Sequence, residues 1–259
     1  MATTFKTFLN NDITSTKTLL HEAIPLTGTI ASGTYGGDSV ALGSETNIKN
    51  YAHGMFQSVY DYPYLSSSAN HIYDLTVGYA SGSALSGTTG VSMQAKKINL
   101  YNQMAQMLVG YDSTGSIRNF DEDGNIADGG TKLKECLFVN FARLLTKDEI
   151  KKGSFSMKIG TGSYSDPFAG VVTISDSGKE NDYRVNSPAG EYAILSATAG
   201  AETGTPACGL IFYQAGVAVL SSSIFQSASV GGILGPTSGT LAEQDRDWET
   251  ELDRTATPA

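Results

Sequence analysis

The strongest indication of site chemistry in this sequence is the acidic loop Asp121–Asp128. Asp121, Asp123 and Asn125 match ligand positions one, three and five of an EF-hand calcium loop. The match then fails, because Ile126 stands where that loop needs glycine and Lys132 where it needs the bidentate glutamate. We therefore interpret the segment as a solvated turn, with an irregular calcium site as the alternative.

The other residue types that carry out catalysis are not arranged for it. None of the three histidines, His21, His53 and His71, has a second histidine or a cysteine two to four residues away, so metal binding has little support. The sequence contains no Gly-x-Ser-x-Gly elbow and no Walker A or dinucleotide-binding loop. We expect no enzyme activity, no cofactor and no metal. A cell-wall hydrolase that uses the carboxylates of Asp121 or Asp123 is the enzymatic alternative.

Aromatic side chains are concentrated in residues 51–80. Tyrosine is both apolar and able to hydrogen bond, so it suits the edge of a β core, a protein–protein interface or a sugar-binding platform. All three interpretations remain open. A receptor- or glycan-binding site would use Tyr60, Tyr62 and Tyr64 together with Asn70 and His71. The candidate assembly interface consists of Tyr51, Phe56, Tyr60, Tyr62, Tyr64, Tyr73 and Tyr79.

Composition argues against two classes of partner. The 259 residues are 40% apolar, which is enough for a core, but only 17% charged. Such a surface is either covered by partners or rich in Ser, Thr and Asn. The net charge of −9, without any run of more than two basic residues, disfavours binding to nucleic acid or to an anionic membrane.

We expect no signal peptide and no membrane-spanning segment. The first residues lack a basic segment followed by an apolar one, and the longest apolar run, Cys208–Leu220, is too short and too polar to span a membrane. We expect synthesis in the cytoplasm. Cys136 and Cys208 lie in apolar runs and should be buried free thiols, with a disulfide between them as the alternative.

The pattern of apolar residues predicts a mainly β protein with an antiparallel sandwich or barrel-like core. One amphipathic helix is expected at about residues 96–109, with an apolar face of Ile98, Tyr101, Met104, Met107 and Leu108 and a C-cap at Gly110. Short helical insertions are expected at Thr14–Ala23 and Asp148–Lys152. Strands are expected at 71–79, 137–142, 154–159, 171–175, 191–197, 209–213 and 217–222, the last two joined as a hairpin through Gln214-Ala215-Gly216.

We expect residues 1–240 to form a single β-rich structural domain, with a sub-boundary near 111–132 as the alternative. Residues 241–259 differ in character, being charged and containing the only tryptophan, and should form a tail.

Five segments of the chain resemble a virion structural protein of T4-like contractile-tailed marine phages, the cyanophage-type myoviruses. They are LLHEAIPLTGTI (19–30), the segment from Asn47 to Tyr79, KKINLYNQMAQMLVG (96–110), the segment from Lys134 to Gly160, and CGLIFYQAGVAVLSSSIF (208–225).

The resemblance implies a bacteriophage structural protein that works by viral assembly, binding other copies of itself as a homo-oligomer and other virion proteins. We expect a place in the tail, baseplate or neck, with a capsid-associated decoration protein or a receptor- or glycan-binding tip protein as alternatives. Many members of this family continue with further strand-rich sequence, which would make this chain a shortened relative.

Overall fold

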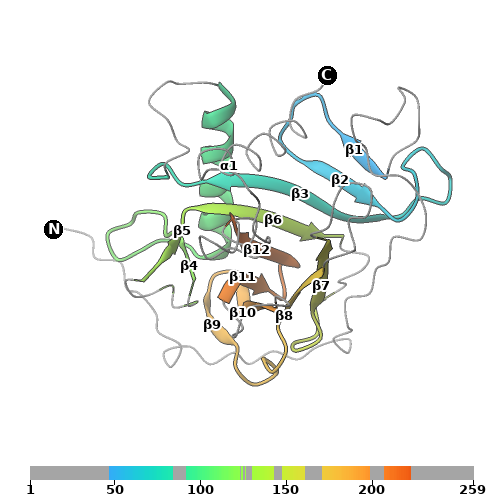
Figure 1. The fold of residues 1–259 in the computed structure, drawn as a ribbon. Helices are drawn as coiled ribbons and strands as arrows, with labels where there is room; N and C mark the ends of the chain where they lie inside the picture. Colours follow the sequence, from blue (N-terminus) through green and yellow to red (C-terminus); the bar gives the residue numbers. More distant parts are fainter. Residues whose placement is uncertain are drawn as a thin grey trace, which may run out of the picture.

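The computed structural model describes residues 47–83, 92–122, 124, 126, 130–142, 148–160, 171–198 and 207–222. Within these residues it contains twelve strands and one helix, α1 (Figure 1). The elements are β1 (Ile48–Asn50), β2 (Gln57–Tyr60), β3 (His71–Tyr79), α1 (Ser92–Leu108), β4 (Phe120–Asp121), β5 (Lys132–Leu133), β6 (Glu135–Phe141), β7 (Ser156–Gly160), β8 (Val171–Ser175), β9 (Arg184–Ser187), β10 (Gly190–Thr198), β11 (Ala207–Phe212) and β12 (Val217–Ser221).

Ten of these strands form one sheet in which every pairing is antiparallel. The strand order is β1-β2-β3-β6-β12-β11-β10-β8-β7, with β9 paired to β10, while β4 and β5 form a separate ladder. The predicted mainly β fold with a single amphipathic helix is therefore confirmed. All ten strands belong to one continuous sheet, and its two end strands, β1 and β7, do not pair with each other in the described residues.

The predicted hairpin is formed by β11 and β12. Phe212 pairs with Val217, so Tyr213–Gly216 makes the connection. Gly216 adopts a φ of 69°, a conformation that costs glycine little, and its N–H donates to the carbonyl of Phe212 at 2.9 Å. Every residue of β12 is buried, as expected for a strand in the middle of a sheet that is covered on both faces.

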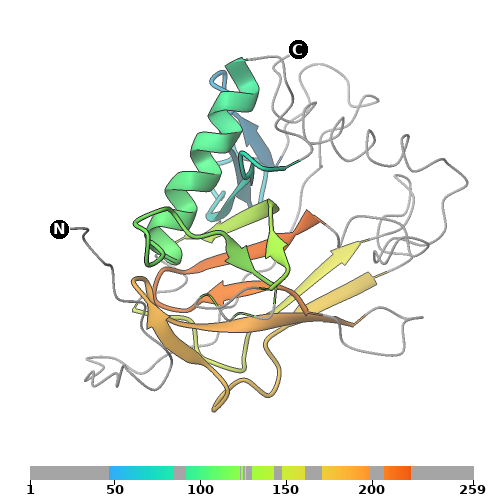
Figure 2. The ribbon, with the colours of Figure 1, turned by 90° about the vertical axis from the view of Figure 1, so that its left-hand side faces the viewer.

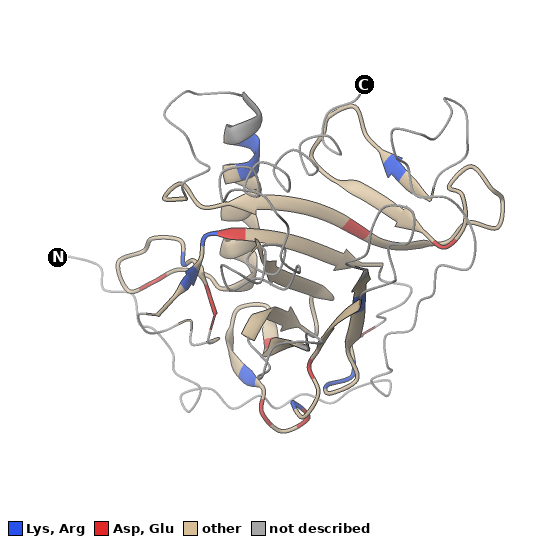
Figure 3. Ribbon diagram, viewed as in Figure 1, with Lys and Arg blue, Asp and Glu red and all other residues tan. Residues whose placement is uncertain are grey.

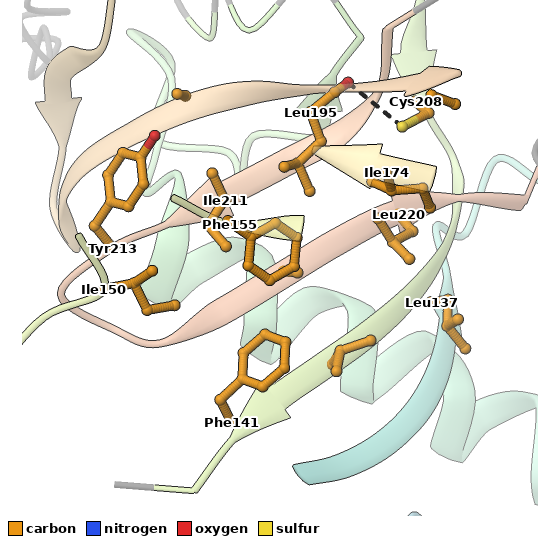
Figure 4. Packing of buried hydrophobic residues seen from close by; sticks show 14 of the residues in the cluster. Leu137, Phe141, Ile150, Phe155, Ile174, Leu195, Cys208, Ile211, Tyr213 and Leu220 are labelled. Atoms are coloured by element: carbon orange, nitrogen blue, oxygen red, sulfur yellow. Dashed lines mark hydrogen bonds between the residues drawn. The ribbon is translucent and has the colours of Figure 1, made fainter. Parts of the chain in front are cut away.

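The sheet curls so that its two halves pack against each other through one face (Figure 1). Val77 and Leu137, from β3 and β6, belong to the same apolar cluster as Ile174 from β8. The rings of Phe141 and Phe155 meet edge to face within it, at a centroid distance of 5.6 Å (Figure 4). Burial of each such side chain contributes about 1.5–3 kcal/mol, so this inner cluster is a major source of stability.

The opposite face of the sheet carries a second apolar cluster, which α1 covers (Figure 2). Tyr101 of the helix packs edge to face on Phe120, at 5.5 Å between centroids, and both rings are fully buried. The Tyr101 hydroxyl donates to the carbonyl of Leu133 at 2.6 Å, which satisfies the polar end of the ring. We call this the outer cluster.

The buried face of α1 differs in part from the predicted one. Tyr101 and Leu108 are fully buried as expected, but Met107 is 52% exposed and Ala105 is buried in its place. The reason is geometric: each step of three residues falls about 60° short of a full helical turn. The series from Ile98 in steps of three therefore drifts to the opposite side of the helix by Met107.

The end of α1 follows the prediction for a glycine cap. Gly110 has a φ of 74°, and its N–H donates to the carbonyl of Ala105 at 3.0 Å. The helix begins at Ser92, four residues before the predicted start.

One predicted helical turn is wrong. Residues 148–152, which we call the strap, form no helix, and Ile150 donates its N–H to the carbonyl of Tyr213 at 3.0 Å. That bridge to the end of β11 competes with helix formation, and Ile150 is fully buried in the inner cluster. The predicted helix at Thr14–Ala23 and the charged tail at 241–259 lie outside the described residues.

The two cysteines are buried free thiols, as predicted. Cys136 belongs to the outer cluster and Cys208 to the inner one, so the sheet separates them. Burial raises the pKa of Cys208 to about 12, which keeps this thiol protonated and unreactive at neutral pH.

Candidate functional site

The aromatic segment of the sequence forms the β1–β2–β3 side of the sheet. Ser58 pairs with Lys49 on one side and with Asp74 on the other, so these three side chains share one face. This is also the face on which α1 packs, because Gly78, further along β3, faces the helix backbone. Figure 3 shows how little charge this region carries: Lys49, Asp61 and Asp74 are the only charged residues in segment 47–83.

Three rings form a first aromatic group beside β1 and β2. Tyr51 stacks on His53 with centroids 5.2 Å apart and contacts Phe56 at 4.9 Å, while His53 and Phe56 lie 5.1 Å apart. The Lys49 ammonium lies over the Tyr51 ring at 5.1 Å from its centroid. Neither core cluster includes these rings, and Phe56 is 36% exposed. We call Tyr51, His53 and Phe56 the ring group.

A second group lies at the loop that joins β2 to β3. Tyr60 contacts Tyr64 at 6.3 Å and His71 at 5.5 Å between ring centroids. Asp61 comes directly after Tyr60, and Asn70 directly before His71. These two residues close the loop, because the Asn70 N–H and side-chain amide donate to the Asp61 carboxylate at 2.6 and 3.0 Å. We call Tyr60, Asp61, Tyr64, Asn70 and His71 the loop group.

Asp74 connects the two groups. Its Oδ1 accepts a hydrogen bond from the Ser58 hydroxyl at 2.5 Å and lies 2.9 Å from His71 Nε2. Tyr51 extends the network, with its hydroxyl 3.3 Å from that of Ser58. Serine and histidine both face the carboxylate here, whereas a catalytic triad needs the histidine between serine and aspartate. The arrangement therefore holds two strands together and does not activate the serine.

The remaining candidate interface residues have other positions. Tyr73 points to the opposite face, packs on the inner cluster and contacts Phe141 at 6.2 Å. Burial raises the pKa of Tyr73, as expected for a ring in the core. Tyr79 is half-buried opposite Glu135, and Tyr62 is half-buried in the loop. Of the seven candidates, Tyr51, Phe56, Tyr60 and Tyr64 are thus in the two aromatic groups.

The interpretation of Asp121 as a solvated carboxylate is wrong. Asp121 is fully buried and forms an ion pair with Lys132, its cross-strand neighbour on β5. Lys132, which stands where an EF-hand has its bidentate glutamate, thus pairs its ammonium group with the carboxylate of Asp121. Asp123, Asn125 and Asp128 lie outside the described residues. In the parts of the chain that the structure describes, no group of three or more His, Cys, Asp or Glu residues could hold a metal ion.

Sequence reasoning missed a buried polar network around the strap. Lys152 Nζ lies 2.7 Å from Glu191 and 3.7 Å from Glu149, and its ammonium is 4.8 Å from the centroid of the Tyr183 ring. Both glutamates are buried. The Tyr213 hydroxyl donates to Asp176 at 2.9 Å close by. The sequence offered no signal for this network, because its members are far apart along the chain.

Comparison of the chain with protein-family models, with curated protein sequences and with solved structures found no match. Among the described residues, no helix is long and apolar enough to cross a membrane.

Proposed function

We propose that this chain is a structural component of a tailed-bacteriophage virion, in the tail, baseplate or neck, that acts through protein–protein assembly. The resemblance of five segments to virion proteins of cyanophage-type myoviruses supports a role in the phage particle. The antiparallel β fold is compatible with that role. The role requires no catalytic step and no cofactor. Its partners would be further copies of the chain and other virion proteins, with no nucleic acid or membrane involved.

The observation that carries the proposal is the ring group. Tyr51, His53 and Phe56 contact one another outside both core clusters, so their rings are not part of the packed core. His53 and Phe56 are exposed, and the Met55 N–H donates to His53 Nδ1 at 3.0 Å, which fixes the imidazole. Preformed aromatic surfaces with little charge are typical of protein–protein contacts.

Charge also favours a contact at this place. The chain carries a net charge of −9, yet segment 47–83 contains one lysine and two aspartates. Two copies, or a copy and another acidic virion protein, would repel each other least where their surfaces are nearly neutral. The ring group is therefore a suitable point of contact in a symmetric assembly.

Hydrogen–deuterium exchange of the free chain and of purified particles that contain it tests the proposal. We expect the amides of residues 51–56 to exchange more slowly in the particle, because a partner covers them. Equal exchange of this segment in both states would contradict the assembly role. Amides of β12, which is buried on both faces, should not change and serve as an internal control.

A matched pair of substitutions tests the same surface by function. Phe56→Ser should reduce incorporation of the chain into particles by about tenfold, the effect of about 1.4 kcal/mol of lost contact. Leu65→Ser is the control, since Leu65 is 68% exposed in the neighbouring loop and belongs to neither core cluster. Tails and capsids are separated before the chain is detected in each fraction. Its presence with the tails or with the capsids distinguishes a tail location from capsid decoration.

A further inference from the structure

The loop group differs from the ring group in its chemistry. Its rings stand beside a carboxylate and an amide, whereas the ring group pairs its rings with a lysine. Asp61 and Asn70 continue the ladder directly beyond the Tyr60–His71 pair, and the Asp61 N–H donates to the Asn70 carbonyl at 3.1 Å. Backbone and side-chain bonds together therefore hold this polar pair in place next to the rings.

The Asp61 carboxylate is both fixed and available. It accepts the N–H and the side-chain amide of Asn70, and the backbone N–H groups of Tyr62 and of Asp61 itself also act on it, while the side chain remains partly exposed to solvent. These hydrogen bonds from Asn70 lower the pKa of Asp61, which keeps the group ionised at neutral pH. An ionised carboxylate of fixed orientation is a strong acceptor for hydroxyl groups.

The rings of the loop group provide an apolar surface beside the polar Asp61–Asn70 pair. Tyr60, Tyr64 and His71 are each half-buried, so part of each side chain remains accessible to a ligand. The planes of Tyr60 and Tyr64 are inclined by 42°, which forms a shallow angle and not a flat stack. Such rings contact apolar C–H groups.

We propose that the loop group binds a neutral saccharide residue. A pyranose presents an apolar C–H face, which would lie against Tyr64 and Tyr60, and vicinal hydroxyls, which would donate to Asp61. Asn70, which is exposed, would supply further hydrogen bonds. The binding goes beyond the assembly role, and the residues that would contact the sugar belong to the loop group alone.

Saturation-transfer NMR and calorimetry on the full chain test the proposal. The probes are the methyl glycosides of glucose, galactose, mannose and N-acetylglucosamine. We expect transfer to the ring C–H protons of at least one probe. Tyr64→Ala should weaken that binding about tenfold, the effect of about 1.4 kcal/mol of lost stacking. Tyr64→Phe should retain it, because the ring remains.

Two further variants separate binding from folding. In Asp61→Asn, the new side-chain oxygen still accepts the Asn70 N–H, so the loop stays closed but loses its charge and about tenfold in affinity. Phe56→Ala, in the ring group, should bind the probe as the wild type does. Absence of transfer to all four glycosides overturns the proposal. Binding that survives both Tyr64→Ala and Asp61→Asn, or a preference for a lysine-rich peptide over every glycoside, overturns it as well.

Discussion

Asp176 shows how a single carboxyl can hold distant parts of this chain together. It is fully buried and accepts hydrogen bonds from the N–H groups of Gly153 and Phe155, at 2.7 and 2.8 Å, and from the Tyr213 hydroxyl. The segment just after the strap, the end of β8 and the end of β11 therefore meet at the Asp176 side chain. Burial raises the pKa of Asp176, although these hydrogen bonds oppose the rise.

Asp176→Asn should lower the free energy of unfolding by about 1–3 kcal/mol, because an amide nitrogen cannot accept and at least one buried N–H loses its partner. A carboxyl with a raised folded-state pKa contributes stability that is present below its ordinary pKa and is lost as the pH rises through the folded value. The difference between wild type and variant should therefore be larger near pH 4 than near pH 8. Urea denaturation at both pH values measures it, and a difference that grows with pH would contradict this account.

Sequence reasoning at the scale of single residues succeeded where a side chain has one physical preference. The apolar contexts of Cys136 and Cys208 predicted their burial correctly. It failed for Asp121, because the stabilising partner, Lys132, becomes a neighbour only through the pairing of β4 with β5. The two aromatic groups were likewise hidden within one run of aromatic residues, since the sequence does not show which rings meet.

At the scale of elements, the contact of α1 with β3 depends on the absence of a side chain. A Cβ atom at Gly78 would lie 2.8 Å from the backbone nitrogen of Tyr101 and 3.1 Å from the carbonyl oxygen of Lys97. Both are backbone atoms of the helix and cannot turn aside. Gly78 thus sets how closely α1 approaches the sheet.

Gly78→Ala should destabilise the protein by about 1–3 kcal/mol, because the helix must move away from β3 and loosen the outer cluster. Gly82→Ala is the matched control, since a Cβ at that position meets nothing within 4 Å. Thermal denaturation followed by circular dichroism compares the two variants. Equal melting temperatures for both would show that the contact is not tight.

Elements with a strong local pattern were predictable and those set by tertiary contacts were not. The alternation in β3 and β6 and the Gly216 turn before β12 marked these strands in the sequence. The strap at 148–152 instead follows the bridge from Ile150 to Tyr213, which overrides its capping sequence. A pattern among neighbouring residues carries no information about a hydrogen-bond partner that is distant in sequence.

At the scale of the whole molecule, both clusters depend on the same strands. Leu195 packs in the inner cluster and Leu210 in the outer one, and both are fully buried on the neighbouring strands β10 and β11. Loss of packing in either cluster therefore weakens strands on which the other cluster also depends. The order of the strands was not predictable, because β12 pairs with β6 across a long stretch of sequence.

Leu195→Ala and Leu210→Ala should each destabilise the protein by about 2–5 kcal/mol and leave a single unfolding transition. Native-state hydrogen exchange checks this: amides of α1 and of β8 should lose equal protection in each variant, although these elements lie on opposite sides of the core. A variant that releases only the elements of its own face would show that the two clusters unfold independently.

The place of β12 has a consequence for how the chain acquires its structure. It pairs with β6 on one side and with β11 on the other, so it joins two halves that are both synthesised before it. Until the ribosome has released residues 217–221, a nascent chain exposes two long apolar strand edges that have no neighbour. Chaperone binding during translation would shield those edges, and a premature stop just upstream of Val217 would leave them open to aggregation.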